Sequence, residues 1–257
     1  MSSFALPVYS LWLRDLRQFF RRRSRVLGAI GQPIVIWLFL GAGFGTGVVG
    51  DGASGMSYAA FLFPGMLLLI TLFSAIFSTI SVIEDRRGGF MQGVLVSPAS
   101  RGAILWGKIA AGVTLSFAQA MLLLLFLPSI GVSVSAQGLL LAMLVLLLAA
   151  VLLTSLGLLI AWRMSSTQGF HAIMNLLLMP MWVLSGALFP VEGAHPWLAA
   201  VMRLNPMYYV TSLFHDMFFL GSGVTVSGGA PWTLSLAVIA VAIIALYLVT
   251  LNTVAKS

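Results

Sequence analysis

Long uncharged stretches are the feature of this sequence that most limits what it can fold into. They cover residues 26–83, where Asp51 is the only charge, and residues 109–162, 164–191 and 217–255, which hold none. A helix that crosses a membrane needs about 20 consecutive, mostly apolar residues. The first two stretches each accommodate two such helices joined by a turn, and the last two accommodate one each. The pattern therefore predicts six transmembrane helices.

The composition supports the same fold class. Of the 257 residues, 60% are hydrophobic and 7% are charged, and the mean hydropathy is +1.08. A soluble domain of this length must cover its surface with polar groups, and this chain has too few of them. We predict an all-α polytopic membrane protein in which residues 1–257 form a single transmembrane domain. The lack of cysteine excludes disulfides, thiolate metal sites and a cysteine nucleophile.

The basic residues predict the orientation in the membrane. With spans over about 27–47, 59–83, 104–127, 137–162, 170–189 and 232–254, twelve of the thirteen Lys and Arg residues fall on one side. Only Arg203 falls on the other side. Basic residues mark the cytoplasmic side of membrane proteins. Both termini are therefore expected in the cytoplasm, and the net charge of +7 needs no nucleic acid to explain it.

An amphipathic helix is expected within residues 1–25, before the first span. Trp12 and Phe20 share one face with other apolar residues, and Arg14 and Arg21 fall opposite. A helix of this kind suits the headgroup plane of a membrane. The first span should be kinked by Pro33.

A charged segment over residues 84–103 connects the second and third spans. Ser97 and Pro98 predict the N-cap and first turn of the next helix, and a short helix parallel to the membrane fits before them. Its apolar side chains share one helical face that requires a cover, either lipid headgroups or a protein cleft. They are Phe90, Met91, Val94 and Leu95.

The segment over residues 190–231 is expected on the outer side. Pro196 can open a short helix that Pro206 closes, and Trp197 suits the membrane interface. This helix carries Arg203, for which Glu192 or Asp216 is the expected ion-pair partner.

Polar residues inside the predicted spans leave alternatives open. Gln168, His171 and Asn175 form a stripe that suits either a conduit wall or helix–helix bonding. Thr71, Ser74, Ser78 and Ser81 share one face of the second span, for which helix packing is the favoured interpretation. The methionine-rich region 164–217 offers soft ligands for Cu(I), but methionine also fills apolar gaps.

Two enzyme-like motifs carry little weight. The glycines over residues 45–50 match G-x-G-x-x-G, but the strand and helix that dinucleotide binding requires do not surround them. Ser54, in Gly52-Ala53-Ser54-Gly55, resembles the serine of rhomboid-type intramembrane proteases but lies in a loop away from a base. No phosphate-binding loop is present, so any ATP would be bound by another chain.

The order of these features resembles one family, the permease subunits of type-2 ATP-binding-cassette exporters. These include relatives of nodulation-factor, daunorubicin and polysaccharide export permeases. The resemblance covers the whole chain: an amphipathic helix, six spans, an acidic–basic–glycine loop that ends in Ser97-Pro98, and Ser185-Gly186 to Phe189-Pro190 followed by Asn205-Pro206. One departure is Gly88-Gly89-Phe90-Met91, where relatives often carry a glutamate.

The resemblance implies a role for each segment. The loop after the second span would form a coupling helix in a cleft of a separate cytoplasmic ATPase, and the segment after the fifth span would form an outer re-entrant helical hairpin that caps the conduit. Two permeases would face each other in a bacterial inner membrane, as a homodimer or with a paralogue. The chain would not itself be an enzyme and would bind no cofactor. The coupling residues would be Glu84, Arg86, Arg87, Phe90, Met91, Val94 and Leu95.

Two other functions are compatible with the sequence. One is a membrane channel or structural subunit without an ATPase, and the other is an intramembrane serine protease. The residues assigned to the conduit or dimer face are Gln168, His171 and Asn175. Those assigned to the outer lid are Glu192, Pro196, Trp197, Arg203 and Pro206.

Overall fold

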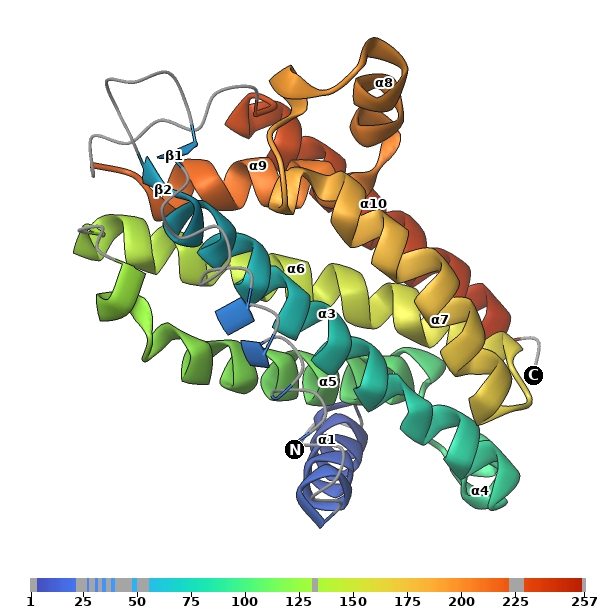
Figure 1. The fold of residues 1–257 in the computed structure, drawn as a ribbon. Coiled ribbons are helices and arrows are strands. Elements are labelled where there is room, and N and C mark those ends of the chain that lie inside the picture. The colour runs from blue at the N-terminus through green and yellow to red at the C-terminus, as the bar shows by residue number, and fades with distance from the viewer. Residues whose placement is uncertain are drawn as a thin grey trace.

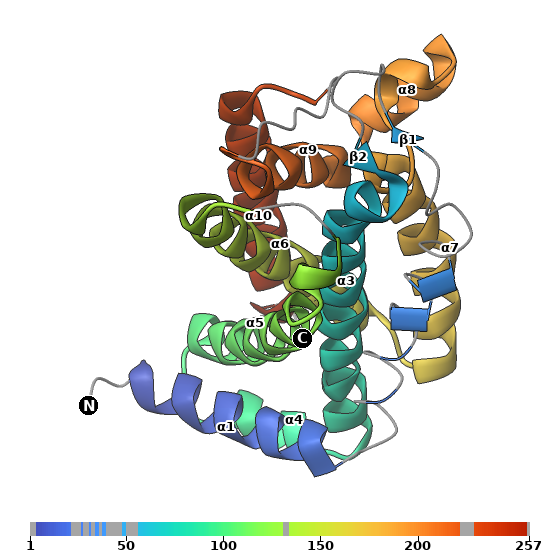
Figure 2. The same cartoon turned by 60° about the vertical axis from the view of Figure 1, so that its left-hand side comes forward.

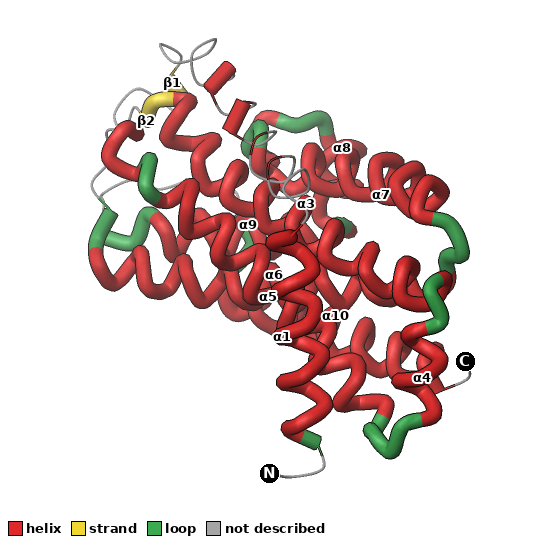
Figure 3. Tube along the Cα trace, turned by 90° about the horizontal axis from the view of Figure 1, so that it is seen from below, coloured by secondary structure: helices red, strands yellow, loops and turns green. Residues whose placement is uncertain are grey.

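The protein is almost wholly helical in the part of the chain that the structure describes (Figures 1 and 3). This computed structural model describes residues 4–21, 27, 31, 34–35, 38–39, 48–49, 56–130, 134–221 and 229–255. The helices are α1 (Ala5–Arg21), α3 (Tyr58–Arg87), α4 (Phe90–Val96), α5 (Arg101–Leu124), α6 (Ala136–Arg163), α7 (Thr167–Trp182), α8 (Pro196–Leu204), α9 (Pro206–Phe218) and α10 (Trp232–Ala255). A two-stranded antiparallel ribbon pairs β1 (Val48–Val49) with β2 (Met56–Ser57).

Short irregular helical segments join some of these elements. A 3₁₀ turn over Leu127–Ile130 follows α5, a π-helical turn over Val183–Ala187 continues α7, and a 3₁₀ turn over Val191–Gly193 precedes α8. Gly186 adopts a φ of 88° inside the π turn, a left-handed conformation that favours glycine.

Five described helices are long and apolar enough to cross a membrane. They are α3, α5, α6, α7 with its π turn, and α10. Their positions agree with the predicted second to sixth spans. The predicted first span over 27–47, with Pro33, lies largely outside the described residues.

Helix α3 is the centre of the bundle. Figure 2 shows it between α7 on one side and α5 and α6 on the other. In its most apolar 18-residue window, 89% of the residues are buried, against 17% for α10. Helix α10 packs mainly on α6 and α9, so most of its surface faces outward.

Small residues allow α3, α5 and α6 to pack closely. A Cβ atom on Gly112 of α5 would lie 2.5 Å from Thr154 Cγ2 of α6 and 2.7 Å from Ser78 Oγ of α3. Thr71 is fully buried in α3 and donates a hydrogen bond to the Leu67 carbonyl at 2.8 Å. These contacts agree with the helix-packing interpretation of the hydroxyl stripe on α3.

The helix boundaries at the end of α3 differ from the sequence prediction. Helix α3 continues through its charged residues to Arg87, and Gly89 turns the chain into α4 with a φ of 75°. Ser97 ends α4 instead of starting the next helix, and the Ser100 hydroxyl accepts the capping hydrogen bond from the Ala103 amide at the start of α5. The Ser97-Pro98 prediction was wrong because a second serine three residues later provides the cap.

The two ends of the bundle carry different accessory helices (Figure 1). At one end, here called the α4 end, α3 and α6 finish, α5 and α7 begin, and α4 and α1 are attached. At the other end, the α8 end, α8 and α9 follow α7. Pro196 opens α8 as predicted, and Pro206 ends it by opening α9, which Asn205 caps. The bounds of α9 were not predicted from the residue pattern, although the family resemblance implied an outer helical hairpin in this segment.

Candidate functional site

A cluster of buried charges lies at the α4 end, between α1, α3 and α5. Its centre is Lys108 of α5, which is 3% exposed. The Lys108 ammonium donates hydrogen bonds to Asp15 Oδ2 of α1 at 2.7 Å and to Asp85 Oδ2 of α3 at 2.7 Å. Asp15 and Asp85 are themselves 7% and 4% exposed. Ions are buried at low cost only when they are paired and hydrogen-bonded, so each carboxylate requires this lysine.

Arg14 completes the cluster from α1. Its guanidinium donates to both oxygens of Asp85, one of them at 2.8 Å, and to Asp15 at 3.1 Å. The hydrogen bond that Arg14 donates to Asp85 raises the pKa of Arg14, although burial of the guanidinium opposes the change. Ser81 adds a hydroxyl that donates to Asp15 at 3.3 Å. The four ionised groups sum to zero charge, which makes their burial tolerable.

The cluster also contacts α4. The Arg14 guanidinium carbon lies 3.7 Å from the centre of the Phe90 ring, a cation–π contact with the first residue of α4. Arg14 therefore touches Asp85 at the end of α3 and Phe90 at the start of α4. One arginine of α1 thus links the last turn of a buried helix to a short exterior helix.

Helix α1 packs on the bundle more closely than its sequence predicted. Leu11, Asp15 and Phe19, four residues apart, form its buried face, while Tyr9 and Phe20 stay 53% and 62% exposed. Arg14 turns toward Asp85, so it does not belong to a purely solvent-facing basic face. The expected separation of apolar and basic faces was too simple because it left Asp15 out.

The four apolar residues assigned to coupling differ in how far they are exposed. Met91 has no exposed surface and belongs to the permanent core of this chain, so it is unavailable to a partner in this structure. Val94 and Leu95 pack partly against the same core, and Phe90 is 39% exposed. The apolar face of α4 that the sequence revealed is therefore covered in part by the protein itself.

The charged members of that assignment lie beside the cluster. Arg86 donates a short hydrogen bond to the Trp162 carbonyl at the end of α6. Arg86 and Arg87 are exposed, and Glu84 is half-buried.

The polar stripe of the fifth predicted span lies on the exterior of the bundle. Gln168, His171 and Asn175 are exposed along α7, and the His171 ring lies 5.7 Å from the Phe77 ring of α3. Leu176, on the same helix, is 80% exposed. This stripe is not brought together with the charge cluster.

The residues assigned to the outer lid lie at the α8 end. Trp197 is 62% exposed, and the Arg203 carbonyl accepts a hydrogen bond from the Tyr209 hydroxyl at 2.9 Å. Arg203 and Asp216 form no ion pair in the described part of the chain, and the alternative pairing of Arg203 with Glu192 stays a prediction. The side chain of Glu192 lies outside the described residues.

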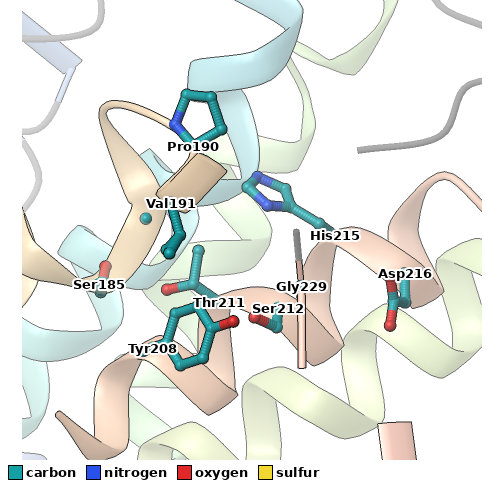
Figure 4. A pocket seen from close by; sticks show the side chains of 10 residues that line it. Ser185, Pro190, Val191, Tyr208, Thr211, Ser212, His215, Asp216 and Gly229 are labelled. Carbon is teal, nitrogen blue, oxygen red and sulfur yellow. The ribbon is translucent and has the colours of Figure 1, made fainter. Parts of the chain in front are cut away.

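A small cavity lies between α7, α9 and the 3₁₀ turn before α8 (Figure 4). It encloses about 20 Å³, enough for one water molecule. His215 lines it and is 5% exposed, with its ring 5.3 Å from the Phe61 ring. Burial lowers the pKa of His215 to about 4, and the backbone of Phe61 opposes the change. His215 is therefore neutral at pH 7.

The described methionines act as apolar filler. Met174 and Met207 belong to the main core, and Met202 belongs to a smaller core under α8. Among the described residues, no group of three or more His, Asp or Glu residues is placed to hold a metal ion.

Comparison with known proteins decides the family. Residues 7–219 match the family model of the ABC-2 type transporter. The chain belongs to the ABC-2 type transporter family. It is 27% identical to Nodulation protein J of Neorhizobium galegae, covering 83% of each chain, and 32% identical to Nodulation protein J of Rhizobium leguminosarum bv. trifolii, covering 76% of this chain and 74% of that one. It is 27% identical to the putative transport permease ycf38 of Cyanophora paradoxa, covering 80% of this chain and 72% of the relative.

Family membership makes this chain a membrane permease subunit of an ABC transporter. Its relatives are transport permeases, and the family implies association with a membrane and with an ABC ATPase. The charge cluster is thus a feature of a transport subunit, at the end of the bundle that carries α4.

The sequence contained a signal for the cluster of this ABC-2 permease that the prediction did not use. Lys108 lies inside the predicted third span, and a charge within a span marks a functional or structural partner. Asp15 is the only acid in the first 50 residues. The three-dimensional pairing of Asp15 with a lysine 93 residues away could not be read from the sequence spacing.

Proposed function

We propose that this permease couples to its ATPase through α4 and that the charge cluster carries the resulting movement into α1, α3 and α5. The observation that supports this most directly is the contact of Arg14 with both Phe90 of α4 and Asp85 of α3. A force on α4 would reach three other helices through this arginine and Lys108, because buried charged pairs resist separation.

The docking surface would be the exposed side of α4. Val96 is 86% exposed and Phe90 is 39% exposed, and apolar side chains that are exposed together on one short helix favour a binding surface. Met91 lies on the opposite side, in the core. The proposed docking set is therefore Phe90 and Val96 with the partly exposed Val94 and Leu95, and Glu84, Arg86 and Arg87 flank it.

Two variants separate docking from transmission. Val96→Asp places a charge on the exposed face without touching the cluster, and we expect it to release the ATPase from the purified permease. Arg14→Gln removes the link to Phe90 but leaves the exterior of α4 intact. We expect it to retain the ATPase and to lose most of the transport-dependent stimulation of ATP hydrolysis.

Both variants are compared at equal membrane levels with Leu204→Ala, which removes an 85% exposed apolar residue at the opposite end of the bundle. Truncating a central apolar anchor at an interface often costs about 2 kcal/mol or more, which is roughly a 30-fold loss of affinity. Retention of the ATPase by Val96→Asp at wild-type stoichiometry would show that α4 is not the docking helix.

The wider assembly is also part of this proposal. Six spans, both termini in the cytoplasm and a bacterial inner membrane fit the distribution of basic residues. The direction of transport would be export, ATP would be bound by the partner subunit, and this chain would hold no cofactor. Residues 1–257 would form one transmembrane domain.

The exterior stripe of α7 would face the second permease or the conduit. Gln168, His171 and Asn175 are polar, exposed and in a span, and polar groups in hydrocarbon require a protein or aqueous neighbour. A symmetric pair of these helices would supply one. Replacing His171 with Leu should then lower transport at matched membrane levels, with little effect on the amount of folded protein.

The α8–α9 hairpin would act as the outer lid. The cavity beneath the hairpin is large enough for only one water molecule, and Trp197 and Arg203 lie on α8, the exterior helix of the hairpin. The movable element would be α8, opened by Pro196 and closed by Pro206, because it is largely exposed while α9 is mostly buried.

A further inference from the structure

A second cavity lies at the α4 end, on the side of α3 that faces α6 and α7. It encloses about 320 Å³ between the last turns of α3, α4 and the connection from α6 to α7. Its polar lining consists of Arg86, Arg87, Gln92 and Ser165. Its apolar lining consists of Ile83, Met91, Leu95 and Met164.

The charges around this cavity favour an anion. No acidic residue is among its lining residues. On the neighbouring side of α3, Asp15 and Asp85 are already paired with Lys108. Arg86 uses one N–H group on the Trp162 carbonyl, which fixes the guanidinium at the cavity wall. A guanidinium presents five N–H donors in a planar fork that suits a phosphate group.

The position of the cavity along the membrane normal, together with its apolar lining, favours an anion that is attached to an apolar group. It lies where the candidate spans α3 and α6 end, at Arg87 and Arg163, and span ends are where lipid headgroups lie. Its lining joins the two arginines on one side to the apolar side chains of Leu95 and Met164 on the other. A phosphate on a glycerol and acyl chain matches both sides, whereas a free phosphate matches only one.

From these observations we propose that this cavity binds the phosphate headgroup of an anionic lipid in the leaflet at the α4 end. The cavity shares Arg86, Arg87 and Leu95 with the edge of the proposed docking surface, but lipid binding to it requires no ATPase. Gln92, Met91 and Leu95 of α4 form one wall of the cavity, so an occupied site would hold α4 against α3 and the α6–α7 connection.

The test uses the full-length permease alone, without any ATPase. The purified protein is titrated in detergent with phosphatidylglycerol, and bound lipid is counted by native mass spectrometry. A basic residue near a membrane surface contributes roughly five-fold in affinity for anionic lipid. We therefore expect Arg86→Gln with Arg87→Gln to weaken phosphatidylglycerol binding by at least roughly ten-fold.

A second variant protects the test against misfolding of the double variant. Gln92 is exposed, and Gln92→Glu adds a carboxylate to the cavity wall while keeping both arginines. We expect this variant to weaken phosphatidylglycerol binding as well. The matched control is Arg163→Gln, which removes an exposed arginine at the same end that does not line the cavity; it should bind as the wild type does.

Two soluble probes and one neutral lipid identify the source of the ligand. Inorganic phosphate and glycerol 3-phosphate should not displace phosphatidylglycerol at millimolar concentration, and phosphatidylcholine should bind more weakly. Displacement by inorganic phosphate would overturn the lipid assignment in favour of a soluble anion. Equal losses in Arg163→Gln and the double arginine variant would overturn it in favour of unspecific surface charge. Unchanged binding in Gln92→Glu and in the double variant would exclude the cavity altogether.

Discussion

The two ends of the helix bundle are stabilised by different means. At the α4 end, two carboxylates, a lysine and an arginine form a buried ionic cluster that joins α1, α3 and α5. At the α8 end, α9 is held by apolar packing and by a buried histidine whose ring lies beside Phe61 and Phe219. The α4 end is held by charge-assisted hydrogen bonds, whereas the α8 end combines apolar packing with hydrogen bonds between neutral groups, such as the bond from the Trp182 indole to the Gly65 carbonyl.

This difference suits the two roles proposed for the permease, in which the α4 end would transmit movement and the α8 end would open as a lid. Separating a paired buried ion is costly, so elements joined by the cluster move together. Apolar surfaces can slide past each other while they remain buried. The following experiments test that contrast, from the largest expected effect to the smallest.

Removing the lysine should have the largest effect on stability. Lys108→Met leaves Asp15 and Asp85 buried with only the Arg14 guanidinium, whose side chain is 32% exposed. Loss of one partner of a buried pair costs about 3–5 kcal/mol. We expect a large drop in the thermal unfolding temperature in detergent and a lower level of protein in the membrane.

The combination of Lys108→Met with Asp15→Asn and Asp85→Asn is the control for that result, because it removes the two unpaired charges as well. It should recover much of the stability but not the stimulation of the ATPase. A single Lys108→Met variant as stable as the wild type would mean that water reaches the cluster and that it is not a rigid link.

Adding a methyl group to the packed core at the α8 end should lower the stability of the protein by less than the loss of Lys108. A Cβ atom on Gly65 of α3 would lie 2.8 Å from Ala187 Cβ and 2.9 Å from the Ala187 carbonyl in the π turn. Gly65→Ala should therefore cost about 1–3 kcal/mol, measured by thermal unfolding. Adding Ala187→Gly should restore part of the loss, and Gly93→Ala, where nothing lies within 4 Å, should have little effect.

Mild acid should have the smallest effect on stability of the three, and between about pH 7 and pH 5.5 we expect that effect at the α8 end. The pKa of His215 is about 4 in the folded protein and 6.5 in the reference state, so the unfolded chain binds the proton first as the pH falls. The stabilisation is complete above pH 6.5 and is lost toward pH 4. Linkage predicts a loss of about 1 kcal/mol between about pH 7 and pH 5.5.

His215→Phe should remove this loss while preserving the aromatic contacts. Burial raises the pKa of Asp216, which makes the folded protein gain stability as the pH falls, opposite to the effect of His215. Because wild type and variant both contain Asp216, the difference between their pH dependences reports the histidine. His195→Asn changes an exposed histidine and should keep the wild-type pH dependence. An equally steep pH dependence in His215→Phe would assign the effect to other groups.

Much of the fold could be predicted from the sequence, since hydrophobic length determines where a helix can span a membrane. The boundaries of α6 and α10 lie within one residue of the prediction at each end. Less could be predicted for α9, because its mixture of aromatic and polar residues is shorter than a span and its burial depends on α6 and α10.

The candidate site was predicted only in part. The apolar residues of α4 were identified, but the side that Met91 faces depends on how Gly88 and Gly89 turn the chain. Asp15 and Asp85 were given no role in the predicted site because a sequence shows ionisable groups without their partners. A charge pattern predicts which side of a membrane a segment occupies, but not which opposite charge it contacts.

The position of Lys108 also bears on how the chain is assembled in the membrane. Asp85 precedes Lys108 by 23 residues, whereas Asp15 precedes it by 93. Asp85 and Lys108 therefore belong to one helical hairpin, α3 and α5, that emerges from the ribosome before α6. Their pairing gives the lysine a counter-ion during insertion, before most of the surface of α3 acquires its protein neighbours. The ion pair that later links α3 to α5 would first serve the biogenesis of this hairpin.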